Sequence, residues 1–451
     1  MRLEASSATF RRRQTPGNRE RGVTCWNLRF DLRQAKWGRR IAFRPVERHC
    51  MPEMPDSPVR QLINAARVRI AEEGMRGLSL RSIAQNAGMS LGSLSYRIGD
   101  KAGLIAQLLE AEHADQERLL ADWRHRLHGL NLAVPSVLAS VITAWFEDMT
   151  KLHRVSAMTG CELLLEAGAN SDSYSGITRI LDVQDAFWVE MLTAHLPADE
   201  AQLFGCAIAN YIRDELPFAL AAGADADYHL LRASTIQCLA SRLSSTGRGL
   251  PDHFAQLVAA AGGDSAEVPL RVDLAPGSKR AEVAAEIASL IAEQGVAAVS
   301  HRAVAARAGV SNSSVAHYFR TRTDLLDAGF GALVLQMRDE LATCDAATQF
   351  QSWAALMRAS HAIALAAARD PQLAPFALDM RRRRSENGRE TLRTALICGR
   401  PIDDASIQAA ALVLVGNFMA MQARGGFDRP GWLSIADLAK MRHQSGVGRP
   451  V

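Results

Sequence analysis

Residues 70–93 have the sequence IAEEGMRGLSLRSIAQNAGMSLGS, and residues 291–314 have the sequence IAEQGVAAVSHRAVAARAGVSNSS. At a shift of 221 residues, eleven of these 24 positions are identical. The shared residues are mostly glycine, serine and alanine, which end helices, cap helices or permit close packing. Such self-similarity predicts two copies of one structural unit in a single chain. The identical pairs include Gly74 and Gly295, Ser79 and Ser300, Arg81 and Arg302, Ala84 and Ala305, Ala87 and Ala308, Gly88 and Gly309, and Ser90 and Ser311.

Each copy has the spacing of a helix-turn-helix. Apolar residues at three- and four-residue steps predict a first helix with one buried stripe. Gly74 and Gly295 can end this helix in the left-handed conformation, which costs other residues about 1 kcal/mol or more. Ser79 and Ser300 are placed to cap a short second helix, which the next glycine ends. A further serine two residues beyond that glycine can cap a third helix, as helix-turn-helix units require.

Each copy resembles the DNA-binding domain of the TetR family of transcriptional regulators. In that family the helix-turn-helix continues into an aromatic cluster and a fourth helix. The second copy matches this pattern closely through residues 317–319. The first copy departs from it, with Tyr96, Arg97 and Ile98 at the positions of the cluster. The remaining helical segments match the family only in length and character, as is usual for its variable ligand-binding domains.

The composition agrees with a helical protein of several domains. The chain has 451 residues, of which 48% are hydrophobic, 22% charged and 6% aromatic. This length exceeds a typical domain of about 150 residues, so we expect two or three domains and an all-α fold. The longest clean apolar run, residues 409–415, is far shorter than the ~20 residues of a membrane span, so we expect a soluble cytoplasmic protein with no membrane partner. The seven cysteines show no Cys-x-x-Cys spacing, so we expect neither disulfides nor a metal site.

Basic residues are concentrated at the start of the chain. Residues 1–50 contain thirteen Lys and Arg against four Asp and Glu, whereas the whole chain has a net charge of only +4. No apolar segment follows them as an export signal would require. Two interpretations stay open at this stage. The segment is a disordered basic arm that adds nonspecific affinity for nucleic acid, or the natural chain starts at Met51 or Met54.

These patterns predict two halves in tandem, each with a helix-turn-helix unit followed by a helical lobe. We call the two lobes the first and second lobe. Breaker-rich sequence between the halves predicts a linker that contains one short helix. The predicted boundaries are a basic extension at 1–55, the first helix-turn-helix unit at 56–105, the first lobe at 106–243, the linker at 244–277, the second helix-turn-helix unit at 278–326, the second lobe at 327–443 and a tail at 444–451.

The resemblance implies that the third helix of each unit enters the major groove of double-stranded DNA, while neighbouring groups contact phosphates. The expected base contacts are Leu91, Gly92, Ser93 and Tyr96 in the first unit, and Asn312, Ser313, Ser314 and His317 in the second. The expected phosphate contacts and caps are Ser79, Arg81, Ser90, Arg97, Lys101, Ser300, Arg302, Ser311, Tyr318, Arg320 and Arg322. Because the two third helices differ in sequence, we expect an asymmetric operator.

The resemblance also implies a small-molecule effector in the lobes and a dimer formed by the last two helices of each lobe. We expect a lipophilic effector that releases a repressor from DNA. The candidate lining residues are Trp145, Phe146, Met149, Cys161, Leu164, Trp188, Met191, Trp353, Met357, His361, Phe376 and Phe418. Because one chain carries both halves, we expect an intramolecular pseudo-dimer, with a homodimer of whole chains left open.

Other functions compete with this interpretation. No phosphate-binding loop, nucleophile motif or metal-ligand spacing occurs, so we expect no enzyme activity, cofactor or metal. His125 and His128 are expected to be solvated, and residues 381–384, four consecutive arginines, are expected on an exposed helix face or against an acidic partner. A second hypothesis is that only the second unit binds DNA and the first half serves for dimerisation and sensing.

Overall fold

The structure is a computed structural model. It describes residues 57–243, 253–260, 274–343, 346–386, 388–397, 401–426 and 433–446. The predicted basic extension lies outside these residues, as do most of the predicted linker and of the tail. All regular secondary structure in the described part of the chain is helical, which confirms the all-α prediction.

The first helix-turn-helix unit comprises α1 (Pro58–Glu73), α2 (Leu80–Asn86) and α3 (Leu91–Ile98). The Ser57 side chain accepts a hydrogen bond from the backbone N–H of Arg60 at 3.2 Å, which caps the start of α1. Gly74 ends this helix at φ 73° and donates its N–H to the carbonyl of Ile70. The predicted apolar stripe of α1 is completely buried. Local sequence signals therefore suffice to build this unit.

The second unit repeats the arrangement with α11 (Lys279–Gln294), α12 (His301–Ala308) and α13 (Asn312–Tyr318). Gly295 ends α11 at φ 76°, and Gly309 ends α12 at φ 63°. Val310 N–H donates to the carbonyl of Ala305 at 3.1 Å, as the equivalent Met89 donates to Ala84 in the first unit. Both copies of the sequence repeat thus fold in the same way.

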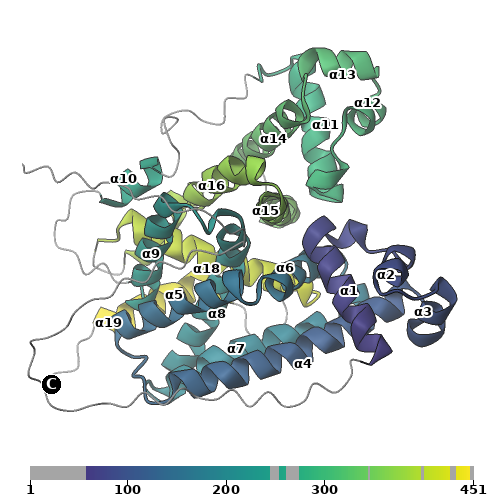
Figure 1. Ribbon diagram of the computed structural model, residues 1–451. Coiled ribbons are helices and arrows are strands. Elements are labelled where there is room, and N and C mark those ends of the chain that lie inside the picture. The colour runs from purple at the N-terminus through teal and green to yellow at the C-terminus, as the bar shows by residue number, and fades with distance from the viewer. Residues whose placement is uncertain are drawn as a thin grey trace, which may run out of the picture. The chain divides into compact units, whose positions relative to one another are not determined.

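The two lobes differ in the length and order of their helices. The first lobe contains α4 (Lys101–Leu127), α5 (Pro135–Lys151), α6 (Arg154–Ala169), α7 (Ile177–Thr193), α8 (Ala198–Ala222) and α9 (Ala226–Ala240). The second lobe contains α14 (Arg322–Thr343), α15 (Ala346–Arg369), α16 (Ala374–Arg382), α17 (Arg389–Leu396), α18 (Asp404–Ala423) and α19 (Ile435–Gly446). The predicted short helix of the linker is α10 (His253–Ala260). Figure 1 shows the course of these helices.

The halves are joined by a crossing of α8 with α18, and the described residues belong to one compact unit. Around this crossing, α6 of the first half packs on α18, and α15 of the second half packs on α8. Each of these two helices also packs on the first helix of its own helix-turn-helix unit, α6 on α1 and α15 on α11. By these contacts α6 and α15 are structural equivalents in the two halves.

The crossing is close because Gly416 of α18 lies against the backbone of α8. A Cβ atom at this position would overlap the carbonyl oxygen of Asn210. The Asn210 side chain donates to Oδ1 of Asn417 at 3.5 Å, and Asn417 Nδ2 donates to the carbonyl of Leu433 at 3.0 Å. A glycine in the middle of a helix is usually unfavourable, so its place here reflects the need for close approach.

Buried ion pairs connect the same two halves. Arg381 of α16 is fully buried, and its Nε donates to both carboxylate oxygens of Glu215 in α8, at 2.9 and 2.7 Å. Arg384 Nε donates to Oδ2 of Asp214 at 2.9 Å. Burial opposes ionisation of Asp214, but Arg384 and the bound His361 outweigh it and lower the pKa of Asp214 to about 2. Removing one partner of such a pair typically costs about 3–5 kcal/mol, because it leaves an uncompensated buried charge.

These contacts correct the expectation of an exposed helix face at residues 381–384. Arg381 and Arg382 are buried, and the acidic partner is the other half of the same chain. Residues 371–397 form a 3₁₀ turn, α16 and α17. Helix α16 ends at Arg382, inside the run of arginines, and Arg384 in the turn that follows reaches Asp214. His125 and His128 are exposed, as expected.

One helix in the described residues, α18, is long and apolar enough to cross a membrane by length and composition. This qualifies the expectation that no segment approaches such a length. In the fold, 89% of its apolar window is buried inside the protein. The apolar surface of α18 is therefore used for packing against α8, α6 and α9.

We predict that Gly416→Ala lowers the free energy of unfolding by about 1–3 kcal/mol, because the added methyl group forces α8 and α18 apart. Gly160→Ala is the matched control, since Gly160 also lies inside a helix but has no atom within 4 Å of the place that the methyl group would take. We expect the control to stabilise the protein by about 0.5–1 kcal/mol. Urea unfolding of both variants measures the difference, and equal stabilities would contradict the close crossing.

Candidate nucleic-acid interface and lobe cavity

The third helix of each helix-turn-helix unit begins at a serine cap. Ser90 Oγ accepts a hydrogen bond from the backbone N–H of Ser93 at 3.1 Å. Ser311 Oγ accepts one from the N–H of Ser314 at 3.0 Å, and the Ser313 and Ser314 hydroxyls share the same network. These caps fix where α3 and α13 begin, and hence which side chains lie in the first turn of each helix.

Each third helix buries one face and exposes the other. Leu94 and Ile98 of α3 are buried, and Val315 of α13 is buried at the position equivalent to Leu94. On the outer face Tyr96 is 92% exposed and His317 is exposed. The residues predicted to contact bases all lie exposed or half-buried on these faces, namely Leu91, Gly92, Ser93, Tyr96, Asn312, Ser313, Ser314 and His317.

Positive side chains surround both exposed faces. Arg81, Arg97, Arg302 and Arg320 are exposed, and among the described residues none of the four has a hydrogen bond or ion pair to a carboxylate. Lys101 is exposed as well. Ser79 and Ser300 cap α2 and α12, accepting from Ser82 N–H and Ala303 N–H. Uncommitted guanidinium groups are suited to contact phosphate oxygens.

The second unit is braced by contacts that the first unit lacks among the described residues. Arg322, predicted to contact phosphate, donates instead to the carbonyls of Val299 and Val296 at 3.3 and 3.2 Å. His301 Nε2 donates to the carbonyl of Phe319 at 2.8 Å, at the end of α13. Sequence reasoning missed His301, because a histidine at the start of a short helix gives no signal of its partner. The rings of Tyr318 and His317 pack edge to face, with 5.3 Å between their centres.

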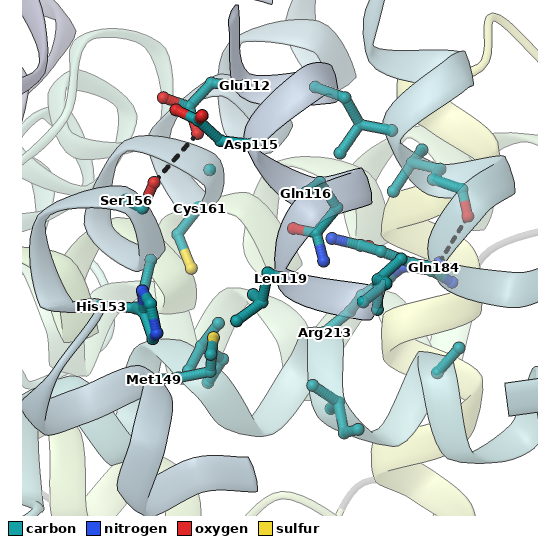
Figure 2. A pocket seen from close by; sticks show the side chains of 18 of the residues that line it. Glu112, Asp115, Gln116, Leu119, Met149, His153, Ser156, Cys161, Gln184 and Arg213 are labelled. Carbon is teal, nitrogen blue, oxygen red and sulfur yellow. Dashed lines mark hydrogen bonds between the residues drawn. The ribbon is translucent and has the colours of Figure 1, made fainter. Parts of the chain in front are cut away.

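A cavity of about 440 Å³ lies in the first lobe and is lined by residues of α4, α5, α6, α7 and α8. Figure 2 shows Met149, Cys161 and Leu119 directed into it, with Gln116, Gln184 and Arg213 grouped at one end. The predicted residues that line it are Trp145, Met149, Cys161, Leu164 and Trp188. The polar lining residues, among them Glu112, Gln116, Gln184 and Arg213, were not predicted.

Two buried charged residues define the polar boundary of this cavity. Arg213 donates to Asp185 at 2.6 Å and to Asn210 at 2.7 Å, but its Nε has no hydrogen-bond partner among the described residues. Glu112 accepts from Arg67 at 2.5 Å, and burial raises the pKa of its carboxyl against the attraction of this arginine. Sequence periodicity cannot separate such buried charges from solvated ones, so only packing reveals them.

The other predicted ligand residues lie elsewhere. Phe146 is buried and packs beneath the guanidinium of Arg232, 5.0 Å from its ring centre. His361 is buried and contacts Oδ1 of Asp214 through Nε2 at 2.7 Å, so it belongs to the contact between the halves. The Trp353 side chain lies outside the described part of the chain. The other predicted residues do not line the first-lobe cavity: Met191, Met357, Phe376 and Phe418. No cluster of three or more metal-binding side chains occurs among the described residues.

Comparison with known proteins identifies both units. The family described as "Bacterial regulatory proteins, tetR family" matches residues 62–108 and again residues 285–328. A curated relative is the HTH-type transcriptional regulator BetI of Burkholderia thailandensis, which is 35% identical over 100 residues. This match covers 22% of the chain and 50% of the relative, so the chain spans about half the length of that protein. The two family matches coincide with the two copies of the repeat.

We predict that Cys161 does not react with iodoacetamide at about pH 8 while the protein is folded. Burial raises the pKa of its thiol to about 12, so the reactive thiolate is scarce at this pH. Peptide mass spectrometry after labelling in native buffer and in urea measures this difference. The buried Cys206, whose thiol pKa is raised by burial to about 11, is the internal control. Rapid labelling of Cys161 in the native protein would contradict the burial of its thiol.

Proposed function

We propose that this chain, whose two helix-turn-helix domains match the tetR family in tandem, is a transcriptional regulator that binds double-stranded DNA in a sequence-specific manner through both domains. The observation that carries this proposal is the pair of capped third helices, each with an exposed polar face beside uncommitted arginines. A helix of this kind fits the major groove, where base edges differ between sequences. Such a protein acts in the cytoplasm, on the nucleoid.

The operator of this protein is asymmetric. Homodimeric regulators bind palindromes because their two recognition helices are identical. Here α3 has Leu91, Gly92 and Tyr96 at the positions where α13 has Asn312, Ser313 and His317. These groups differ in hydrogen-bonding capacity and in apolar surface, so they select different bases. The α8–α18 crossing supports an intramolecular pseudo-dimer, in which one chain supplies both half-site contacts.

The protein acts as a repressor that a small molecule releases from DNA. The first-lobe cavity contains tryptophans and Arg213, whose Nε has no hydrogen-bond partner in the part of the chain that the structure describes. It therefore suits a largely apolar molecule that carries a hydrogen-bond acceptor. A ligand that binds best to a lobe conformation in which the helix-turn-helix units no longer fit the DNA grooves together lowers DNA affinity. The decrease equals the coupling free energy, commonly about 1–3 kcal/mol. Occupation of a promoter by the free protein would then block transcription until the ligand binds.

A second hypothesis is that only the second unit contacts DNA. It is favoured by the His301 brace and the His317–Tyr318 ring contact, both of which belong to the second unit. In that case the first half would serve in dimerisation and sensing. Separate disruption of each unit distinguishes the two hypotheses.

We predict that selection from random DNA recovers sites with two unlike half-sites. His317→Ala should weaken binding through the second half-site by about 1–3 kcal/mol and relax its base preference. Arg97→Gln should weaken binding through the first half-site with little change in base preference, and should reduce the slope of log affinity against log salt by about 1. Recovery of perfect inverted repeats would contradict the asymmetric operator. If Arg97→Gln leaves affinity and salt dependence unchanged, the second hypothesis holds.

We predict that Gly160→Leu fills the first-lobe cavity without disturbing the fold. Gly160 lines the cavity, and a Cβ atom added to it would have no other atom within 4 Å. The fluorescent probe anilinonaphthalene sulfonate, which has apolar rings and an anionic sulfonate, should therefore bind the natural protein and bind the variant at least about tenfold more weakly, as expected when the pocket is filled. DNA affinity without a ligand should not change. Equal probe binding by both proteins would show that the cavity is not the ligand site.

A further inference from the structure

Arg369, the last residue of α15, connects the second half of the chain to the helix-turn-helix unit of the first half. Its Nε donates to the carbonyl of Ala71 at 2.9 Å, and one terminal nitrogen donates to the carbonyl of Ile70 at 3.0 Å. These carbonyls belong to the last turn of α1, where backbone acceptors have few partners within the helix. A cation at a helix C-terminus also interacts favourably with the helix dipole.

Glu162 of α6 completes this contact. It accepts from Arg369 at 2.5 Å and, through its other oxygen, from the backbone N–H of Met75 at 3.4 Å. Gly74 lies between these groups, with Glu162 Oε1 3.3 Å from where its Cβ would stand. One arginine from the second lobe and one glutamate from the first lobe therefore hold the same turn of the first helix-turn-helix unit.

The end of α15 is fixed against the first half from the other side as well. Arg154, the first residue of α6, donates to the carbonyl of Ala368 at 2.7 Å and to the carbonyl of Leu220 in α8 at 3.0 Å. The hydrogen bond from Arg154 therefore fixes the backbone next to Arg369, from which the Arg369 side chain extends to α1. A side chain that starts from a fixed backbone position can set the position of the element it contacts.

The second helix-turn-helix unit is held differently: its hydrogen bond from the first half is exposed and runs from Arg76 to Oε1 of Gln294 at 3.5 Å. The structural equivalent of α15 is α6, and α6 ends in Ala169, which has no side-chain donor. Gly295, the equivalent of Gly74, has no atom within 4 Å of where its Cβ would stand. Along α15 itself, packing against α11 joins the second unit to the same helix that holds the first. Figure 1 shows α15 between α11 and α1.

We infer that Arg369 is a positioning residue for the first helix-turn-helix unit, so that a helix of the second half sets where the first half presents its DNA-contacting face. The inference rests on the proposed function for its effect on DNA binding, although the contact itself does not depend on it. The two units are consequently unequal in attachment as well as in sequence. The first is held by side chains from both lobes at the end of α1, whereas the second packs on its own half and receives one exposed hydrogen bond from Arg76 of the first unit.

The test compares Arg369→Met with Arg358→Met. Both arginines lie on α15 and border the cleft between the two units, but Arg358 contacts Gly168 and Gln422, at 3.4 and 3.5 Å, and not α1. Methionine keeps an aliphatic stem and removes the donors. Hydrogen–deuterium exchange is measured on peptides that cover residues 70–78 and, as the internal reference, residues 301–308 of α12, because Gln294 at the end of α11 contacts Arg76. Only Arg369→Met should speed exchange in the first peptide, and neither variant should change the second.

The DNA arm uses the selected operator with one half-site scrambled at a time. Arg369→Met should weaken binding through the first half-site roughly tenfold, within the usual range for coupled sites, and leave the second within about twofold. If Arg369→Met does not fold, Arg369→Lys is used. Lysine keeps the positive charge but lacks the planar guanidinium that donates to the α1 carbonyls and to Glu162 together, so the same exchange difference is expected. Unchanged exchange at 70–78, or equal weakening at both half-sites, overturns the inference. If the natural protein binds no DNA but Arg369→Met still speeds exchange at residues 70–78, only the proposed function is overturned.

Discussion

The close crossing of α8 and α18 is the constraint on which the rest of the structure depends. Gly416 permits backbone contact between these helices, and the acidic pair Asp214 and Glu215 on α8 then lies within reach of Arg384 and Arg381. Each charge is buried and paired with a charge from the other half. Because an unpaired buried charge is costly, the first lobe is complementary to the second lobe and not to another copy of itself.

This complementarity lets the two halves carry different parts of the proposed activity. In the first lobe, five helices line the cavity that we assign to an effector. In the second lobe, Arg381 and Arg384 extend to acidic residues of the first lobe, and His361 is hydrogen-bonded to Asp214. In a homodimer, both subunits carry the same residues, so every cavity and every charged contact occurs twice. In a tandem chain, one half can carry a cavity while the other half carries different residues at the corresponding place.

The same asymmetry reaches the helix-turn-helix units. Arg369 and Glu162 fix the first unit at the end of α1, whereas Arg322 and His301 brace the second unit internally. Proteins that bind two half-sites depend on the separation of their recognition helices. Here that separation is set by contacts of α15 and α6, which lie between the crossing helices and the units that we propose meet DNA.

The sequence by itself determined the helix-turn-helix units, because their signals are local: an apolar stripe, a glycine with positive φ, and a serine three residues before the amide it caps. Sequence also placed the minor, apolar part of the cavity lining, since Trp145 and Trp188 lie on the apolar faces of their helices. Only the tertiary structure decided the inward turn of Arg381, the pairing of His361 with Asp214, and the reach of Arg369 to α1. The sequence around a charged side chain does not indicate its partner when that partner is more than a hundred residues away, because only folding brings the two together.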